Sequence, residues 1–278
     1  MLSLIYYFSL EYDPIKNILG KFISRNTFFR RLFYKTLGLM FLREWYVKRK
    51  IRQIYITNPP EFILDAGSGF GQYSYFIAKL FPKANIRSVD VKEDQIEDCK
   101  YFFSRSGIKN CTFDVIDLTA IDESNKYNFI LSVDVMEHIE DDTGVFKRFY
   151  NALKTDGMVL INTPSNIGGS DVHSDSEDSF IGEHVRSGYS KEEICSKLES
   201  AGFKIDSFEY TYGKWGSRYW RLALKYPMLI LNKSKLLLIL LPFYYLFTIW
   251  WAWLFMLLDI NTKNKETGTG ILVVAKKI

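Results

Sequence analysis

Between residues 59 and 212, short apolar runs alternate with amphipathic segments of helical periodicity, and few folds accommodate this order. The alternation predicts an α/β fold, in which a parallel sheet carries helices on both faces. The predicted strands are Phe62–Asp65, Ile86–Val89, Thr112–Val115, Phe129–Val133, Met158–Asn162 and Phe203–Tyr212. The predicted helices are Phe70–Phe81, Lys92–Arg105, Asp142–Leu153 and Ser190–Ala201.

A glycine-rich turn joins the first predicted strand to the first predicted helix, in Ile-Leu-Asp-Ala-Gly-Ser-Gly-Phe-Gly from Ile63 to Gly71. Glycines permit a tight turn and close approach of a ligand to the backbone. The helix that follows offers free N–H groups at its positive end. Asp90 ends the next predicted strand, about 20 residues on, where an acidic side chain can accept both hydroxyls of a ribose. The spacing therefore predicts a nucleotide-like ligand.

This turn resembles the first motif of the class I S-adenosylmethionine-dependent methyltransferases. Three later stretches agree with the family's motifs in order, namely Val115–Leu118, Leu131–His138 and Leu153–Gly157, although Thr-Asp replaces the usual Pro-Gly in the last. The resemblance implies S-adenosylmethionine as cofactor and a Rossmann-like, seven-stranded sheet whose last strand, from Gly270, is antiparallel. The cofactor-binding residues that it implies are Asp65, Gly67, Gly69, Gly71, Asp90, Val91, Asp117, Leu118 and Ser132.

All three histidines follow the fourth predicted strand, on the side where the substrate enters this fold. An oxygen acceptor often needs a base, and histidine suits that task near neutral pH. His138, His173 and His184, together with Tyr189, are therefore the candidate catalytic or substrate-binding residues. The alternative is a gating loop whose histidines bond to backbone.

A divalent cation is a second alternative, because Asp134, Glu137 and His138 lie three and four residues apart. The pattern resembles the Glu-x-x-Glu-His of ubiquinone-type O-methyltransferases, with Asp134 in place of the first Glu. A bound metal ion would acidify a phenol or catechol. The Glu-His pair also occurs in many methyltransferases without metal, so we expect no metal ion.

Aromatic residues make up 17% of the chain and gather outside these motifs. Residues 1–58 hold 11 Lys and Arg against 3 Asp and Glu, and a helix over 28–55, capped by Asn26 or Thr27, would be basic and amphipathic. Such a helix packs on the main domain with a solvated basic face, or lies on anionic lipid, or does both. The net charge of +4 is too small to indicate nucleic acid. The three cysteines lack metal spacing and indicate a reducing compartment.

A segment of about 55 residues separates the last two predicted strands. It contains 23 residues without charge, Leu236–Leu258, a length that can cross a bilayer. Both flanking strands belong to one sheet, so the chain has to return to the side that it left. Either the segment breaks at Pro242, or Trp220–Leu231 forms the other arm, or two helices lie in the membrane plane. The alternative in solution is an insertion buried against the N-terminal helices or against a second subunit.

We therefore divide the chain into a basic helical region (1–58), a methyltransferase domain (59–212), an apolar, membrane-associating helical insertion (213–267) and a final strand (268–278). The expected protein is a monotopic or peripheral methyltransferase on the cytoplasmic face of the membrane. It would methylate a lipophilic acceptor at a hydroxyl, in lipid or secondary-metabolite biosynthesis. The alternatives are a methyltransferase for a soluble sugar or small metabolite, with the insertion as a homodimer interface, and a non-catalytic membrane scaffold.

Overall fold

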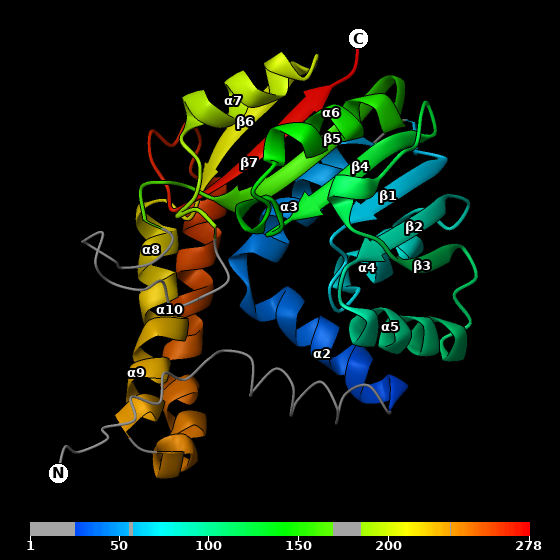
Figure 1. Cartoon of the computed structure of the whole chain (residues 1–278). Helices are drawn as coiled ribbons and strands as arrows, with labels where there is room; N and C mark the ends of the chain where they lie inside the picture. Colours follow the sequence, from blue (N-terminus) through cyan, green and yellow to red (C-terminus); the bar gives the residue numbers. More distant parts are fainter. Residues whose placement is uncertain (1–25, 56–57, 169–184, 234) are drawn as a thin grey trace, which may run out of the picture.

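The protein is described by a computed structural model that covers residues 26–55, 58–168, 185–233 and 235–278. One sheet of seven strands has the order β3-β2-β1-β4-β5-β7-β6, and Figure 1 shows it above a pair of long helices. Strand β7 is antiparallel to both of its neighbours, while β1–β5 are parallel. The predicted α/β fold, with a reversed last strand, is confirmed. The strands are β1 Phe62–Ala66, β2 Asn85–Asp90, β3 Cys111–Val115, β4 Tyr127–Val133, β5 Leu153–Pro164, β6 Lys204–Thr211 and β7 Gly270–Lys276.

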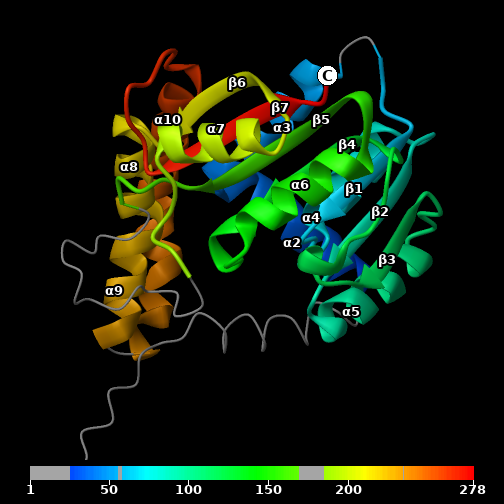
Figure 2. The same ribbon diagram turned by 45° about the horizontal axis from the view of Figure 1, so that its top comes forward.

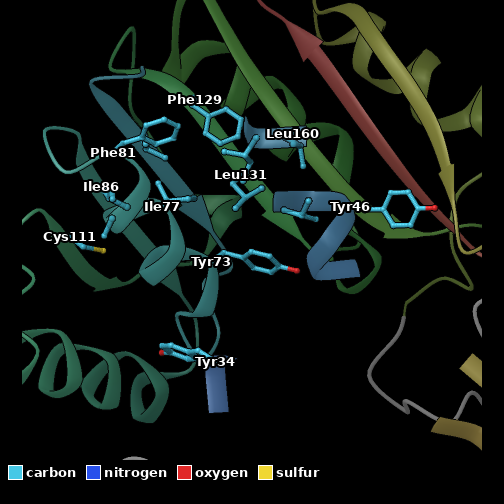
Figure 3. Close-up of a cluster of buried hydrophobic side chains, with 14 of the residues drawn as sticks. Tyr34, Tyr46, Tyr73, Ile77, Phe81, Ile86, Cys111, Phe129, Leu131 and Leu160 are labelled. Carbon is cyan, nitrogen blue, oxygen red and sulfur yellow. The ribbon is translucent and has the colours of Figure 1, made fainter. Parts of the chain in front are cut away.

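Helices cover both faces of the sheet, and each face has its own apolar core (Figure 2). Helices α4 (Gln72–Leu80), α5 (Glu93–Arg105) and α3 (Leu42–Ile54) pack on one face. Helices α6 (Asp142–Ala152) and α7 (Lys191–Ser200) pack on the other. Strand residues alternate between the two cores, as the pleat requires. Figure 3 shows part of the first core, where Ile77 of α4 meets Phe129 and Leu131 of β4.

The basic N-terminal segment forms two helices rather than the single predicted one. Helix α2 (Thr27–Met40) begins at Asn26, whose side chain accepts a hydrogen bond from the Phe28 N–H at 2.8 Å, so the predicted cap is confirmed. Phe41 is extended (φ −106°, ψ 114°) and separates α2 from α3. A straight helix over 28–55 would be about 42 Å long. The break allows α3 to lie in the sheet core while α2 reaches the glycine turn.

The apolar insertion is a helical hairpin that projects beside the sheet (Figures 1 and 2). Its first arm is α8 (Lys214–Trp220), the π-helical η3 (Arg221–Lys225) and α9 (Tyr226–Lys233), followed by the 3₁₀ turn η4 (Lys235–Leu240). Its second arm is α10 (Leu241–Asn261). Tyr244 and Tyr245 of α10 donate to the carbonyls of Leu222 and Ala223 at 2.6 and 2.8 Å. An earlier apolar stretch thus forms the other arm, as one prediction held, and Pro242 starts α10 instead of breaking it.

Within the described part of the chain, helix packing covers one side of α10. Ala252, Met256 and Asp259 are buried against α8 and α3. The opposite side is apolar and exposed, at positions spaced three or four apart: Phe243, Leu246, Phe247, Trp250, Trp251, Leu254, Leu257 and Leu258. We call these eight side chains the open face of α10. By length and composition α10 is the one helix among the described residues that could cross a membrane.

Candidate cofactor site and its surroundings

Three left-handed glycines shape the turn between β1 and α4. Gly67, Gly69 and Gly71 have φ of 86°, 51° and 73°, a region that other residues rarely adopt. The N–H groups of Gly67 and Ser68 both donate to the carbonyl of Val89 on β2 at 2.9 Å. A Cβ on Gly67 would lie 2.2 Å from Cγ2 of Val135, so the chain after β4 closes tightly over the turn. Residue 67 therefore has to be glycine, both because of its left-handed backbone and because a side chain would overlap Val135.

Asp90 holds the turn from the end of β2. Its Oδ2 accepts from the Gly69 N–H at 2.8 Å, and its Oδ1 accepts from the Lys92 N–H at 3.0 Å. The carboxylate is half-buried, and each oxygen keeps a further lone pair for a ligand hydroxyl. Asp90 therefore both orders the turn and stands where a ribose-binding acid was predicted.

Asp65 is buried at the end of β1, and its Oδ2 accepts from the Ser74 hydroxyl at 2.5 Å. Burial raises the pKa of Asp65 to about 7, because a charged carboxylate is poorly solvated there, and Ser74 opposes that shift. Asp65 thus joins β1 to the first turns of α4, directly behind the glycine turn.

The residues present fit a cofactor with several polar groups. Among the described residues, the enclosed side-chain atoms without a hydrogen-bond partner at this end of the sheet include Ser68 Oγ, Gln72 Oε1 and Ser132 Oγ. Buried polar groups are normally paired, so such atoms beside a turn built for close approach indicate a ligand. The glycine turn and Asp90 would hold S-adenosylmethionine here.

By the family resemblance, Val115–Leu118 is the segment that lines the adenine of the cofactor. It begins at the end of β3, beside the end of β2. Val91 and Val115 are 60% and 48% exposed, so they offer apolar surface at that edge. Asp117 is exposed and accepts from the Thr119 N–H at 2.8 Å, which starts the short helix η1 (Leu118–Ala120). Leu118 itself is buried beneath. Asp117 can therefore reach a base, whereas Leu118 supports the segment from the core.

The sequence trio of Asp134, Glu137 and His138 does not form a metal site. Asp134 has φ of 52° and forms an ion pair with Arg43. Glu137 is buried and accepts from the Thr163 hydroxyl at 2.9 Å, and burial raises its pKa. No group of three His, Cys, Asp or Glu residues in the described part of the chain is arranged for a metal ion. The cation alternative gains no support, because each carboxylate has its own partner.

The predicted substrate-side residues lie in different places. His138 is half-buried at the end of the short helix η2 (Met136–His138), which follows β4. The strand order reverses between β1 and β4, and in open α/β sheets the ligand crevice lies at the carboxyl ends of the strands at that point. Tyr189 is fully buried, with its hydroxyl 2.7 Å from Asp142 Oδ2 and 3.0 Å from the Met136 carbonyl. Tyr189 therefore stabilises the chain after β4 and does not face a substrate. His173 and His184 lie outside the described residues.

Asp142 is the centre of an ion-pair cluster that the sequence analysis did not foresee. Lys197 lies 2.7 Å from Asp142 Oδ2, and Arg186 pairs with the same oxygen. Burial opposes ionisation of Asp142, but the Lys197 and Tyr189 hydrogen bonds and the Arg186 charge lower its pKa overall. The cluster ties α6, α7 and the segment at 185–189 together on the acceptor side of the sheet.

A second unforeseen contact fixes α2 on the glycine turn. Arg30 is 1% exposed, and it donates through Nη2 to the Phe70 carbonyl at 2.8 Å and through Nε to the Tyr34 hydroxyl at 3.0 Å. Tyr34 donates to the same carbonyl. The prediction of a solvated basic face was wrong for Arg30. The helical spacing of a cation is the same whether its side chain meets water or a buried carbonyl, so the sequence does not distinguish the two.

The sheet order, the glycine turn, and the acids Asp65 and Asp90 beside that turn define a Rossmann-like fold of the methyltransferase type. The profile of the family described as "Methyltransferase domain" matches residues 59–216, more than half of the chain. The chain therefore belongs to this family, the class I S-adenosylmethionine-dependent methyltransferases, and the predicted family is confirmed.

Individual relatives are more distant. A malonyl-[acyl-carrier protein] O-methyltransferase of Bacillus anthracis is 29% identical over 109 residues, which are 39% of each chain. The match thus spans about two fifths of that relative's length. Phosphoethanolamine N-methyltransferase 2 of Haemonchus contortus, solved with S-adenosyl-L-methionine, has a TM-score of 0.61 and 21% identity, covering 93% of this chain and 60% of that one. The [4+2]-cyclase SpnF has a TM-score of 0.57 and 14% identity, covering 84% and 80%. These two structures show the fold, not the acceptor.

Proposed function

We propose that this protein transfers a methyl group from S-adenosylmethionine to a hydroxyl of a lipophilic acceptor at a membrane surface. The observation that carries the transfer is the left-handed glycine turn, held by Asp90 and bordered by unpartnered polar atoms. The cofactor supplies a methyl group on a positively charged sulfur. The chain's own residues orient the two partners, since methyl transfer depends mainly on alignment and the exclusion of water.

Two attachments of the sheet domain, the N-terminal helices and the hairpin, support a membrane location. The open face of α10 presents eight large apolar side chains, more than a soluble monomer normally exposes in one patch. The end of α2 joins the hairpin, because Trp253 Nε1 donates to the Leu39 carbonyl at 3.1 Å. Helix α2 adds Phe28 and Leu32 as exposed apolar residues beside exposed Arg31 and Lys35. Aromatic residues flanked by cations favour the lipid interface.

An oxygen acceptor is supported by two observations. The relative of Bacillus anthracis is named as an O-methyltransferase. His138 lies half-buried beside the crevice, and an imidazole in that position can act as a general base toward a hydroxyl. The proposed location is the cytoplasmic face of the membrane, because free thiols such as those of buried Cys99 and Cys111 stay reduced there.

Calorimetry on the purified full chain tests cofactor binding first. Wild type should bind S-adenosylmethionine at one saturable site, and Asp90→Ala should weaken binding at least tenfold, because both the turn and the ribose lose their acceptor. Asp94→Ala, an exposed acid at the start of α5, is the matched control and should bind like wild type. Absence of binding to folded wild type would refute the function.

Turnover is then measured with isotope-labelled S-adenosylmethionine and membrane extracts. A labelled lipid that is heavier by one methylene unit would support a lipophilic acceptor. Label found only in water-soluble products would favour the sugar or metabolite alternative, and binding without any turnover would favour the scaffold.

A further inference from the structure

Arg43 brings a positive charge from the N-terminal helices to the carboxyl edge of the sheet. It lies in the first turn of α3, and its guanidinium forms an ion pair with Asp134, which follows β4. Its backbone N–H donates to the hydroxyl of Tyr212, just after β6, at 3.1 Å. Helix α3, the segment after β4 and the segment after β6 therefore meet at this residue.

The Arg43–Asp134 pair borders the crevice where the cofactor turn lies. Asp134 directly precedes Val135, whose methyl groups pack against Gly67. Tyr73 lies in the first turn of α4, where burial and the charge of Glu44 raise its pKa well above the ordinary value, and the nearby Arg43 charge opposes that rise. Figure 3 shows Tyr73 at the edge of the core, with its hydroxyl directed away from Ile77. Through Asp134 and Val135, Arg43 is thus linked to the segment that closes over the glycine turn.

Partial exposure makes this ion pair suited to exchange. The side chains of Arg43 and Asp134 are 34% and 28% exposed, so neither is sealed in the core. A guanidinium binds carboxylate and phosphate through parallel, charge-assisted hydrogen bonds. An anion that arrives from solvent can replace Asp134 at small cost, because Arg43 keeps a charged partner in both states. The cations of the other described ion pairs of α3 lie farther along the helix: Lys48 pairs with Glu44, and Arg49 and Lys50 both pair with Glu209.

We propose that Arg43 receives an anionic group of the acceptor, a phosphate or a carboxylate, and that Asp134 is its resting counter-ion. The inference rests on the proposed function and narrows it to an anionic amphiphile. The acceptor's apolar chain would lie toward the hairpin, since Tyr219 of α8 donates to the Met40 carbonyl, immediately before the α2–α3 break. The charged group would stop at Arg43, which places the rest of the head group over the crevice.

The test is calorimetric titration of the full chain, saturated with S-adenosylhomocysteine, with decyl phosphate, decanoate and decanol below their aggregation concentrations. The three probes share one chain length, so contact with the open face of α10 is the same for all. We expect at least one anionic probe to bind about tenfold more tightly than decanol, as one charge-assisted bond implies. The ratio of decyl phosphate to decanoate then tells phosphate from carboxylate. Equal binding of all three probes would overturn the inference.

Variants identify the residue responsible. Arg43→Ala should remove the preference for anions, and Arg43→Lys should restore part of it. Arg52→Ala, which removes an exposed cation of the same helix lying over the Phe76 ring, should keep the preference. Melting curves show that each variant is folded. An undiminished preference in folded Arg43→Ala would overturn the inference.

Asp134→Asn separates ligand binding from a purely structural ion pair. Asparagine tolerates the left-handed backbone at this position. A resting counter-ion competes with the ligand, so its removal should tighten decyl phosphate or decanoate binding severalfold. Weaker or unchanged anion binding would show that the pair is structural. Because every titration starts from bound S-adenosylhomocysteine, failure here leaves cofactor binding intact, whereas failure of the proposed function appears as absent cofactor binding.

Discussion

At the scale of single residues, the glycine turn makes a prediction with an internal control. Gly67 and Gly107 both have left-handed φ, of 86° and 70°, but a Cβ at Gly107 meets nothing within 4 Å. Alanine at either position costs about 1–2 kcal/mol for the backbone. Gly67→Ala should lose about 1–3 kcal/mol more, because its methyl group overlaps Val135. Urea unfolding of both variants measures the difference, and equal losses would show that the turn yields freely.

Asp65 should make the stability of the protein depend on pH. Burial raises its folded pKa to about 7, above the ordinary value of 3.8. Between these values the folded state binds more protons than the unfolded state, so this group's stabilisation is complete below pH 4 and is lost as pH rises toward 7. Asp65→Asn, which keeps an acceptor for Ser74, should flatten that part of the profile. Unfolding curves from pH 4 to 8 test this, and an identical slope in both proteins would contradict the raised pKa.

Which site residues were predictable depends on how local their function is. Asp65 and Asp90 could be predicted because strand ends and sequence spacing fix their positions at one edge of the sheet. Arg30 and Arg43 could not be predicted, because their partners, Phe70 and Asp134, come from elements that are distant in sequence. Tyr189 was predicted on the substrate side together with the histidines, whereas its buried hydroxyl donates to Asp142, a partner 47 residues earlier in the sequence.

At the scale of elements, Asp259 fixes the hairpin to the sheet domain. This carboxylate is 1% exposed, accepts from the Gly216 N–H at 2.8 Å, and accepts from the Tyr46 hydroxyl at 2.6 Å. It thereby joins α10 to α8 and to α3. Asp259→Ala leaves the buried Gly216 N–H without an acceptor and leaves the Tyr46 hydroxyl only the backbone carbonyl of residue 259, so it should cost about 2–3 kcal/mol. Asp141→Ala, at an exposed cap of α6, should cost only about 1 kcal/mol.

Thermal unfolding followed by tryptophan fluorescence compares these two variants, since Trp215 stacks on Phe255 within the hairpin. An equal loss of stability in both variants would mean that Asp259 stabilises the hairpin no more than an exposed helix cap does.

The elements themselves were largely predictable, and the exceptions have a tertiary cause. The strands and helices of residues 59–212 follow from periodicity, because each buries one defined face. The break at Phe41 has no glycine or proline to mark it. It arises because Arg30 fixes the first half of this amphipathic segment to the glycine turn, whereas Tyr46 fixes the second half to Asp259 of the hairpin. For the hairpin, topology predicted only that the chain returns, since a single crossing would separate β6 from β7, and it left open which segment forms the other arm.

At the scale of the whole molecule, the excess of aromatic residues has a structural explanation. The N-terminal helices and the hairpin are far apart in sequence, yet they contact each other through Trp253 and Tyr219. Both also contact the sheet domain near the cofactor turn, α2 through Arg30 and α8 through Tyr212 and Tyr219. A membrane-bound acceptor would therefore enter between the attachments and the catalytic edge, which composition alone could not show.

The membrane location is testable on the open face of α10. Phe247 and Trp250 are 72% and 66% exposed, so replacing both by serine costs little packing. We expect the double variant to lose at least tenfold in binding to anionic phosphatidylglycerol vesicles, because two aromatic rings no longer enter the interface. Tyr101→Ser, at a 49% exposed position on α5, should bind vesicles like wild type. Flotation measures the bound fraction, and calorimetry should give unchanged S-adenosylmethionine affinity for all three proteins. If wild type stays unbound and sediments as a dimer that the double variant dissociates, the open face is a subunit interface and the acceptor need not be a lipid.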